Sequence, residues 1–291
     1  MRIYRIWRSS FVDLHVSKYV PPFVLDIAKY LFPEMTYAPQ GWYLKNSRSK
    51  GWYEMSVAEA QGKHWSTLVK NLQGPGPLGV AHFPWSLTRE DRANHNAMMS
   101  FGYVLALVAR KKESISILDW GGGAGHYYLY GRALLPEVGI EYHCYDVPYL
   151  CELGKKLTPE GHFHDSDADL IAKQFDLVVS SSSLHYFENW REVARKLAAF
   201  TREFLYIARL QTVSRAPSFV AVHKLYRAGY TEHLSWCLNH QELVSCVEES
   251  GLELVREFVF GEKWSIRGAP DKVDSRGFLF RRREMTPNEE R

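Results

Sequence analysis

The sequence predicts an α/β fold, in which helices cover both faces of a mostly parallel sheet, and three features indicate it. From Ile115 onward, short aliphatic and β-branched runs alternate with longer segments of helical periodicity, as in strand–helix–strand units. A glycine-rich turn follows the first of these runs, and an acidic residue ends the next one. The 291 residues are 46% hydrophobic and 24% charged, the balance of an ordinary globular protein.

The alternating region defines the order of the elements. We predict strands at Ile115–Asp119, Ile140–Asp146, Phe175–Ser180 and Phe204–Leu210, with a weaker one near His162–His164. Helices are expected between them, at His126–Leu135, Pro148–Leu157 and Trp190–Phe200. In the last of these, apolar residues recur at helical spacing, which predicts one buried face.

The pattern changes after Leu210. Residues 211–239 are polar and aromatic, and we predict an insert with several helix formers and no strand. A helix is expected at Gln241–Glu249, with Asn239 as its N-cap. Two final strands are predicted at Leu252–Phe260 and Gly277–Phe280, and residues 282–291 are expected to be a frayed tail.

The N-terminal region is rich in Trp, Tyr and Gly, and we expect residues 1–87 to form a mainly helical cap. The run Gly74–Gly79 (GPGPLG) cannot form regular structure and marks a boundary. A long helix at Thr88–Ala109 then leads into the second domain, which we place at residues 88–281. The chain is thus predicted to have two parts.

Composition excludes several classes of protein. Lys and Arg number 36 and Asp and Glu 33, so the net charge of +3 is too small for a nucleic-acid binder that relies on bulk charge. The longest apolar run, Tyr103–Ala109, is far shorter than the roughly 20 residues of a membrane span. The four cysteines form no CxxC pair, which favours buried thiols in a reducing cytoplasm.

The most informative segment runs from Ile117 to His126 (ILDWGGGAGH) and joins a predicted strand to a predicted helix. Glycines there let the backbone approach a ligand closely and adopt positive φ. A dinucleotide fingerprint, Gly-x-Gly-x-x-Gly/Ala, fails in both registers, because its last position falls on His126 or Tyr128. An NAD-linked oxidoreductase is therefore disfavoured.

The residues that are present, Asp119, Gly121, Gly123 and Gly125, have the spacing acid-x-Gly-x-Gly-x-Gly. This spacing resembles motif I of the class I S-adenosylmethionine (SAM)-dependent methyltransferases. The resemblance implies a Rossmann-like seven-strand sheet with SAM as the cofactor. It also implies that the turn surrounds the amino-acid part of SAM and that Asp119 lies near its ammonium group.

Asp146 ends the second predicted strand, 21 residues after Gly125. A carboxylate at the carboxyl end of such a strand can accept hydrogen bonds from both ribose hydroxyls. Val147 would then contact the adenine. The alternative is that Asp146 only caps the helix that begins at Pro148.

Two later segments also resemble this family. Asp165 and Ser166 have the acid-plus-small-polar character that binds the adenine amino group in these enzymes; the alternative is that Asp165 or Asp167 is only an acidic residue of a loop. The segment Phe175–Phe187 (FDLVVSSSSLHYF) resembles motif IV of small-molecule methyltransferases, which makes Ser180 a further cofactor-site candidate. More loosely, residues 20–32 and the region after Leu210 resemble bacterial methyltransferases of cell-surface polysaccharide clusters.

A hydroxyl acceptor has a high pKa and benefits from a general base, most often histidine. His185, at the end of the fourth strand, and His223, in the insert, are the candidate catalytic residues. The alternatives are that His185 only shapes the cofactor pocket and that His223 lies on a surface helix. Other histidines that could contribute to the pocket are His64, His82, His95 and His233. No histidine and carboxylate spacing indicates a metal site.

Aromatic side chains have two expected uses. Aromatic faces attract a sulfonium group, and the candidates are Trp120, Tyr127 and Tyr186. The aromatic residues of the cap could close over the acceptor or pack within the cap itself, and they are Trp42, Tyr43, Trp52, Tyr53 and Trp65.

We therefore expect a cytoplasmic, SAM-dependent methyltransferase that methylates a hydroxyl of a small molecule or a sugar. The alternatives are N- or C-methylation of a small natural product and non-catalytic SAM binding. Residues 1–32 mix arginines with apolar residues, which would suit a peripheral helix on the inner membrane face. A helix docked on its own domain, or a homodimer contact, is the favoured interpretation.

Overall fold

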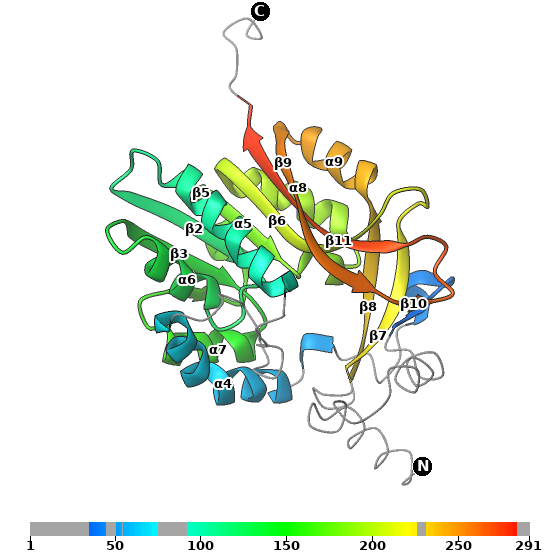
Figure 1. Cartoon of the computed structure of the whole chain (residues 1–291), viewed down its shortest axis with the longest axis horizontal. Helices are drawn as coiled ribbons and strands as arrows, with labels where there is room; N and C mark the ends of the chain where they lie inside the picture. Colours follow the sequence, from blue (N-terminus) through cyan, green and yellow to red (C-terminus); the bar gives the residue numbers. More distant parts are fainter. Residues whose placement is uncertain (1–34, 45–50, 54, 75–91, 226–230, 284–291) are drawn as a thin grey trace, which may run out of the picture.

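A central parallel sheet determines where the functional residues lie. The computed structural model describes residues 35–44, 51–53, 55–74, 92–225 and 231–283 (Figure 1). Seven of the described strands make up this sheet: β2 (Ser114–Trp120), β3 (Gly139–Tyr145), β4 (His162–His164), β5 (Phe175–Ser181), β6 (Thr201–Val213), β9 (Leu252–Trp264) and β11 (Val273–Arg282). Their order in space is β4-β3-β2-β5-β6-β11-β9.

The strand directions complete this topology. The pairs β2–β3, β2–β5, β3–β4 and β5–β6 are parallel. Only β11 is reversed within these seven described strands, and it pairs antiparallel with β6 on one side and β9 on the other. The Rossmann-like seven-strand sheet predicted from the sequence is confirmed, including the weak strand β4 and the final pair.

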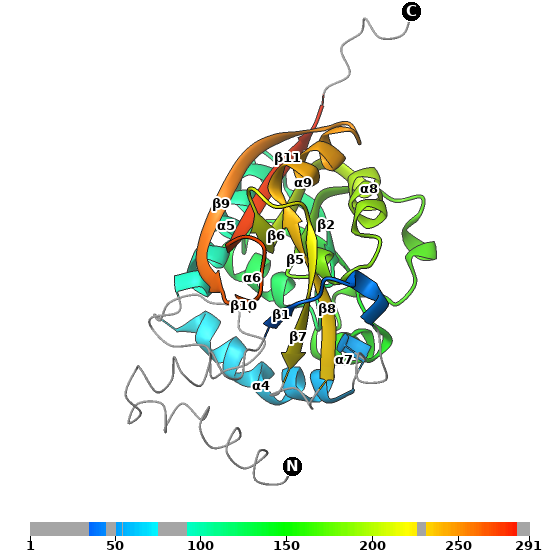
Figure 2. The same cartoon turned by 90° about the vertical axis from the view of Figure 1, so that its right-hand side faces the viewer.

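Helices cover both faces of the sheet, as predicted (Figures 1 and 2). One face carries α5 (Arg92–Val108), α6 (His126–Leu134) and α7 (Pro148–Leu157), and the other carries α8 (Trp190–Phe200) and α9 (His240–Glu248). Alternation along β2 supplies both cores, since Ile117 faces the first and Leu118 the second. The predicted cap of α9 is also confirmed, because Asn239 Oδ1 accepts hydrogen bonds from the backbone N–H of Gln241 and Glu242.

The expectation that residues 211–239 contain no strand is wrong. Strand β6 continues to Val213, and β7 (Phe219–Leu225) pairs antiparallel with β8 (Thr231–Asn239). Each strand alternates between two apolar clusters: Phe219 and Ala221 face one, and Val220 faces the other. Period-two burial on both faces therefore outweighs the helix propensity of the segment.

The hairpin of β7 and β8 adds strands to the sheet at the carboxyl end of β6. Strand β8 pairs in parallel with the last residues of β6, and β1 (Met35–Tyr37) pairs antiparallel with β7. The short strand β10 (Ile266–Arg267) pairs with β1 in turn. In Figure 1 the strands β7, β8 and β10 lie at the lower right, away from α4, α6 and α7.

The described part of the N-terminal region contains α4 (Met55–Gln73) and two short 3-10 helices, η1 (Gly41–Leu44) and η2 (Gly51–Tyr53). Trp65 and Leu68 of α4 join the core between the sheet and α5–α7, so this helix contacts the second predicted domain directly. The domain boundary near residue 87 and the proposals for residues 1–32 lie outside the described residues and stay predictions. Helix α5 lies inside the predicted helix at residues 88–109.

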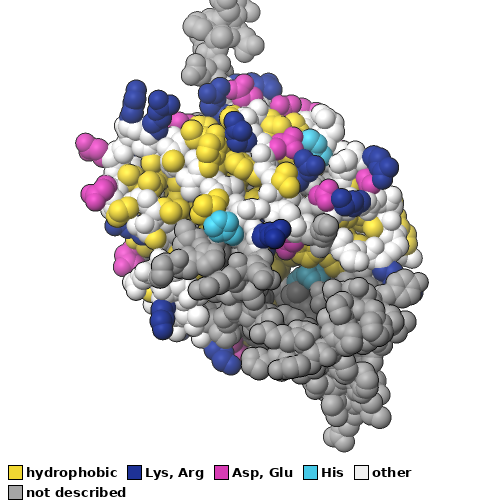
Figure 3. Space-filling view, in the orientation of Figure 1, with side chains coloured by type: hydrophobic (Ala, Val, Ile, Leu, Met, Phe, Trp, Pro, Cys, Tyr) yellow, Lys and Arg dark blue, Asp and Glu magenta, His cyan; other side chains and the backbone are white. Residues whose placement is uncertain are grey.

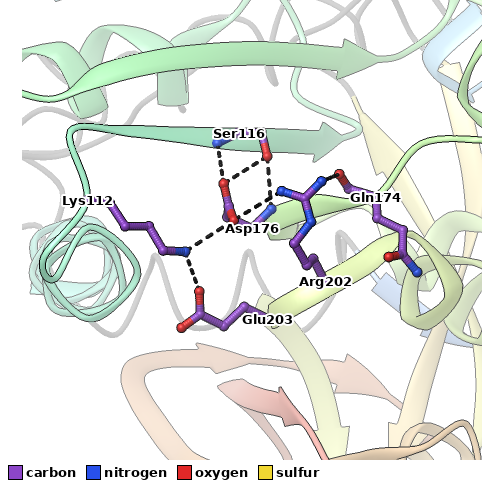
Figure 4. A network of polar contacts seen from close by, with 6 residues as sticks. All are labelled: Lys112, Ser116, Gln174, Asp176, Arg202 and Glu203. Carbon is purple, nitrogen blue, oxygen red and sulfur yellow. Dashed lines mark hydrogen bonds and ion pairs between the residues drawn. The ribbon is translucent and has the colours of Figure 1, made fainter.

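A polar network fixes the amino ends of the central strands (Figure 4). Asp176, the second residue of β5, accepts hydrogen bonds from Ser116 N (2.8 Å), Ser116 Oγ (3.0 Å) and Lys112 Nζ (3.1 Å). Arg202 and Glu203 complete the network. Burial opposes ionisation of Asp176, but these hydrogen bonds outweigh it and lower its pKa. Asp176, the acidic residue at the start of the predicted motif IV segment, therefore has a structural role.

The surface drawn in Figure 3 mixes charges of both signs and shows apolar side chains gathered over α5 and β9. Tyr103 of α5 and Val259 of β9 are exposed, and Arg256 lies over the Tyr103 ring. Among the described helices, none combines the length and the apolar character needed to cross a bilayer. All four cysteines are buried free thiols.

Candidate active site

The glycine turn leaves β2 at the carboxyl edge of the sheet, and its glycines have conformational reasons to be there. Gly121, Gly123 and Gly125 all have positive φ, between 63° and 93°. A Cβ on Gly121 would lie 2.3 Å from Ser183 Cβ, and one on Gly123 would lie 2.9 Å from Gln61 Oε1. The turn is therefore closely covered on two sides, and only glycine fits.

Asp146 is tied directly to this turn. Its Oδ2 accepts a hydrogen bond from Gly123 N at 2.7 Å, and its Oδ1 accepts one from Val147 N at 2.6 Å. Burial raises the pKa of Asp146 to about 6, although these two hydrogen bonds favour the carboxylate. The two sequence features that most strongly indicated a cofactor site thus meet in one place.

A cavity of about 510 Å³ opens over this place. Five of the predicted cofactor residues line it: Gly121, Gly123, Asp146, Val147 and Asp165. The described residues of its wall include Asp146, Asp165 and Glu188 but neither Lys nor Arg. An acidic wall of this kind suits a ligand with positive charge, such as a sulfonium.

The other predicted cofactor residues are not among those that line the cavity. Asp119 is fully buried under the turn, where Tyr142 OH donates to its Oδ2 at 2.6 Å, and burial raises its pKa to about 7. Ser180 exchanges a hydrogen bond with Ser183, which in turn donates to Trp120 O at 2.6 Å. Gly125 is the N-cap of α6, and Ser166 caps the 3-10 helix at Asp167–Leu170. Asp119, Ser180 and Gly125 are therefore buried near the turn, whereas Ser166 is exposed to solvent.

The two candidate bases are also not among the residues that line the cavity. His185 is buried, and neither ring nitrogen has a hydrogen-bond partner within the described ranges. Burial, with the nearby charges of His223 and Arg209, lowers the pKa of His185 to about 3. His223 is on strand β7, so the alternative that it lies on a surface helix is wrong, and burial lowers its pKa to about 4.

Among the histidines that the structure describes, His233 lines the cavity, and it was one of those predicted to contribute to the pocket. It pairs with His223 across the β7–β8 hairpin, and the two ring centroids are 5.1 Å apart. Trp52 stacks on His233 at 5.5 Å, and Tyr186 contacts it edge-on at 4.9 Å. Within the described residues neither His233 nitrogen has a hydrogen-bond partner. Recognising the alternation on both sides of residues 226–230 would have indicated this pair.

Some of the predicted aromatic residues line the cavity, and the others are packed elsewhere or exposed. Trp42, Trp52, Tyr53 and Tyr186 line the cavity. Among the others, Trp65 contacts His126, Trp120 stacks on Tyr145 at 3.9 Å, Tyr127 donates to Ser181 Oγ, and Tyr43 is almost fully exposed. The N-terminal region therefore contributes aromatic side chains to the cavity wall. Whether these side chains close over the acceptor stays a prediction.

Gln61 of α4 also lines the cavity, and it has no place among the sequence predictions. The sequence around Gln61 contains no binding motif and indicates only an amphipathic helix. Its position opposite Gly123 results from the packing of α4, which the sequence pattern does not reveal.

Comparisons with known proteins identify the family and similar structures. A family model described as a methyltransferase domain matches residues 92–257. No curated protein matches the chain. Solved structures with a similar fold include an S-adenosylmethionine-dependent methyltransferase from Clostridium acetobutylicum, with 11% identity over 69% of this chain and 96% of that one and a TM-score of 0.46. The CcbJ methyltransferase from Streptomyces caelestis has 13% identity over 80% and 100% of the chains and a TM-score of 0.46.

A third similar structure is the 1,6-didemethyltoxoflavin-N1-methyltransferase from Burkholderia thailandensis with bound S-adenosylhomocysteine. It has 13% identity over 78% of this chain and 89% of that one, with a TM-score of 0.44.

Proposed function

Because the chain belongs to the methyltransferase-domain family and is a SAM-dependent enzyme, we propose that it methylates a hydroxyl group of a small molecule or a sugar. The single observation that carries the choice of a hydroxyl is the position of His233 on the wall of the cavity, with His223 behind it. An oxygen nucleophile must lose a proton, and an imidazole next to the acceptor can receive it.

The residues around the glycine turn fit the cofactor. We assign the ribose to Asp146 and the adenine to Val147, Asp165 and Ser166, while Asp119, Ser180 and the turn glycines hold the remaining part of the site. The support is that Gly121 and Gly123 have no room for side chains and that the Asp146 carboxylate faces the same cavity. When bound, SAM supplies an electrophilic methyl group next to a positively charged sulfur.

The protein's own contribution to the reaction is mainly positional. Aligning the acceptor oxygen with the methyl carbon removes much of the entropic barrier. Trp52 stacks on the His233 ring and Tyr186 contacts it edge-on, and these two aromatic rings also contact each other, with centroids 5.4 Å apart, so the three rings pack together and fix the imidazole. Because burial lowers the pKa of His233, the imidazole is neutral near pH 7 and has a lone pair for the departing proton.

His185 and His223 remain candidates for direct roles. Their rings are buried and neutral, and each is close to the wall on which His233 lies. We propose that His223 and His185 orient the residues that touch the acceptor, and that either becomes the base if the acceptor displaces Tyr186. Four buried free thiols support the proposed cytoplasmic location.

A label-transfer experiment tests the proposal. The purified protein is incubated with SAM carrying a CD3 methyl group and with metabolite and glycan extracts, and products are found by mass spectrometry. A product whose labelled methyl group is on oxygen is expected. A label on nitrogen or carbon would support the alternative acceptors, and no label in any product would favour a non-catalytic SAM-binding protein.

A further inference from the structure

Gln61 of α4 is placed against the cofactor turn although it belongs to the N-terminal region. Its side chain is 3% exposed and lines the cavity. The amide lies so close to Gly123 that a Cβ there would be 2.9 Å from Gln61 Oε1 and 3.3 Å from Nε2. Within the part of the chain that the structure describes, the buried Oε1 has no hydrogen-bond partner. This oxygen borders the cavity and is available to accept a hydrogen bond from a ligand there.

The helix that carries Gln61 is held firmly in place. One turn further on, Trp65 contacts the ring of His126, the first residue of α6, with centroids 5.0 Å apart. Next to Gln61, Gly62 faces Leu153 of α7 so closely that a Cβ would be 3.3 Å from Leu153 Cδ1. The amide of Gln61 is therefore positioned by two helices of the sheet domain.

The position of Gln61 also indicates which part of SAM it meets. Asp146 and Asp165, the candidates for ribose and adenine, are on the β3 and β4 side of the cavity. Gln61 covers the glycine turn instead, where the amino-acid part of the cofactor is expected. That part carries an ammonium and a carboxylate, and a carboxamide matches both, because its oxygen accepts and its NH2 group donates.

The absence of positively charged side chains among the described residues of the cavity wall supports a role for Gln61. Among the described lining residues there is no Lys or Arg to neutralise the carboxylate of the amino-acid part. Within the described part of the wall, neutral donors are the groups that can bind that carboxylate, and Gln61 is a buried one next to the glycine turn. We infer that Gln61 binds the amino-acid end of SAM and so makes the N-terminal region part of the cofactor site.

This inference rests on the SAM-dependent methyl transfer of the proposed function and deepens it at the cofactor site. It gives α4 a role in the cofactor site besides its packing in the core, because without Gln61 the cavity would bind the amino-acid half of SAM more weakly while keeping its contacts to the nucleoside half. The enzyme would then distinguish poorly between S-adenosylhomocysteine and 5′-methylthioadenosine, which lacks the amino-acid end.

Titration calorimetry with these two ligands provides the test. Gln61→Leu is expected to weaken the binding of S-adenosylhomocysteine by about tenfold, the loss of one or two hydrogen bonds to charged groups, and to leave 5′-methylthioadenosine within about twofold. Asp146→Ala should weaken both ligands.

Gln73→Leu, the same substitution at an exposed position of the same helix, is the matched control and should change neither affinity. Equal losses for both ligands in Gln61→Leu, or no loss for either, would overturn the inference. If the wild-type protein bound neither ligand, the SAM assignment itself would fail. The nature of the acceptor does not enter these measurements, so they are independent of the choice of a hydroxyl.

Discussion

Asp146 and Gly123 are joined by a 2.7 Å hydrogen bond from the backbone N–H of the turn to the carboxylate at the end of the neighbouring strand. The bond fixes the distance between two elements that are 23 residues apart and places both on one cavity. It also leaves the carboxylate able to accept further hydrogen bonds, since each oxygen has more than one lone pair.

Replacing Asp146 with Ala should weaken S-adenosylhomocysteine binding by about tenfold or more, because two charge-assisted hydrogen bonds to the ribose would be lost. Titration calorimetry measures the loss. Asp274→Ala, on β11 of the sheet, is the control and should bind as the wild type does. An unchanged affinity in Asp146→Ala would remove the ribose assignment.

Alanine variants of the three site histidines should differ in how much they lower the rate of methyl transfer. His233→Ala is expected to lower the rate of methyl transfer by about a hundredfold, the usual contribution of a general base, with S-adenosylhomocysteine affinity within about twofold. His185→Ala and His223→Ala should have smaller effects if they only position other residues. Rates are measured with the acceptor identified by label transfer. Full activity of His233→Ala would show that His233 is not the general base.

Asp119 should make stability depend on pH. Its pKa of about 7 lies above the value of about 3.9 in an unfolded chain, so the folded protein binds the proton more tightly. The free energy of unfolding therefore falls as the pH rises from about 4 to about 7. Asp119→Asn cannot ionise and keeps an oxygen for Tyr142, so it removes this loss.

The Tm of Asp119→Asn relative to the wild type should consequently increase from pH 5 to pH 8, measured without SAM. Asp165→Asn, at an exposed carboxylate, is the control. A Tm difference that does not change with pH would contradict the assignment of this titration to Asp119.

Asp176 should matter for stability but not for the cofactor. Asp176→Asn keeps the shape but loses the charge that Lys112 and Arg202 share, and we expect Tm to fall by about 3–6 °C. Because its pKa is lowered, the stabilisation is present above about pH 4 and is lost as the pH falls below that value. Calorimetric scanning measures Tm. S-adenosylhomocysteine affinity should not change, and a tenfold loss would contradict a purely structural role.

Local signals account for the elements that the sequence predicted well. Helix α7 begins at Pro148 because proline suits a first helical turn, and α8 has one apolar face from Trp190 to Phe200. The glycine turn was recognisable for the same reason, since the positive φ of Gly121, Gly123 and Gly125 is a property of the local chain.

The elements that were missed depend on distant contacts. The β7–β8 hairpin contains polar residues such as Lys224 and Glu232, and its burial comes from pairing with β1 and β6. The sequence predicted His233 only as one of several histidines that could contribute to the pocket, because its place on the cavity wall depends on that pairing. Asp119 lies on a central strand that is buried on both faces, so alternation along the sequence does not show whether it faces the cavity.

A crystal structure of the protein with S-adenosylhomocysteine tests the central claim most directly. The account predicts both ribose hydroxyls within hydrogen-bond distance of the Asp146 carboxylate and the sulfur directed toward the side of the cavity that contains Tyr186 and His233. A ligand bound elsewhere, or one whose sulfur faces away from His233, would contradict it.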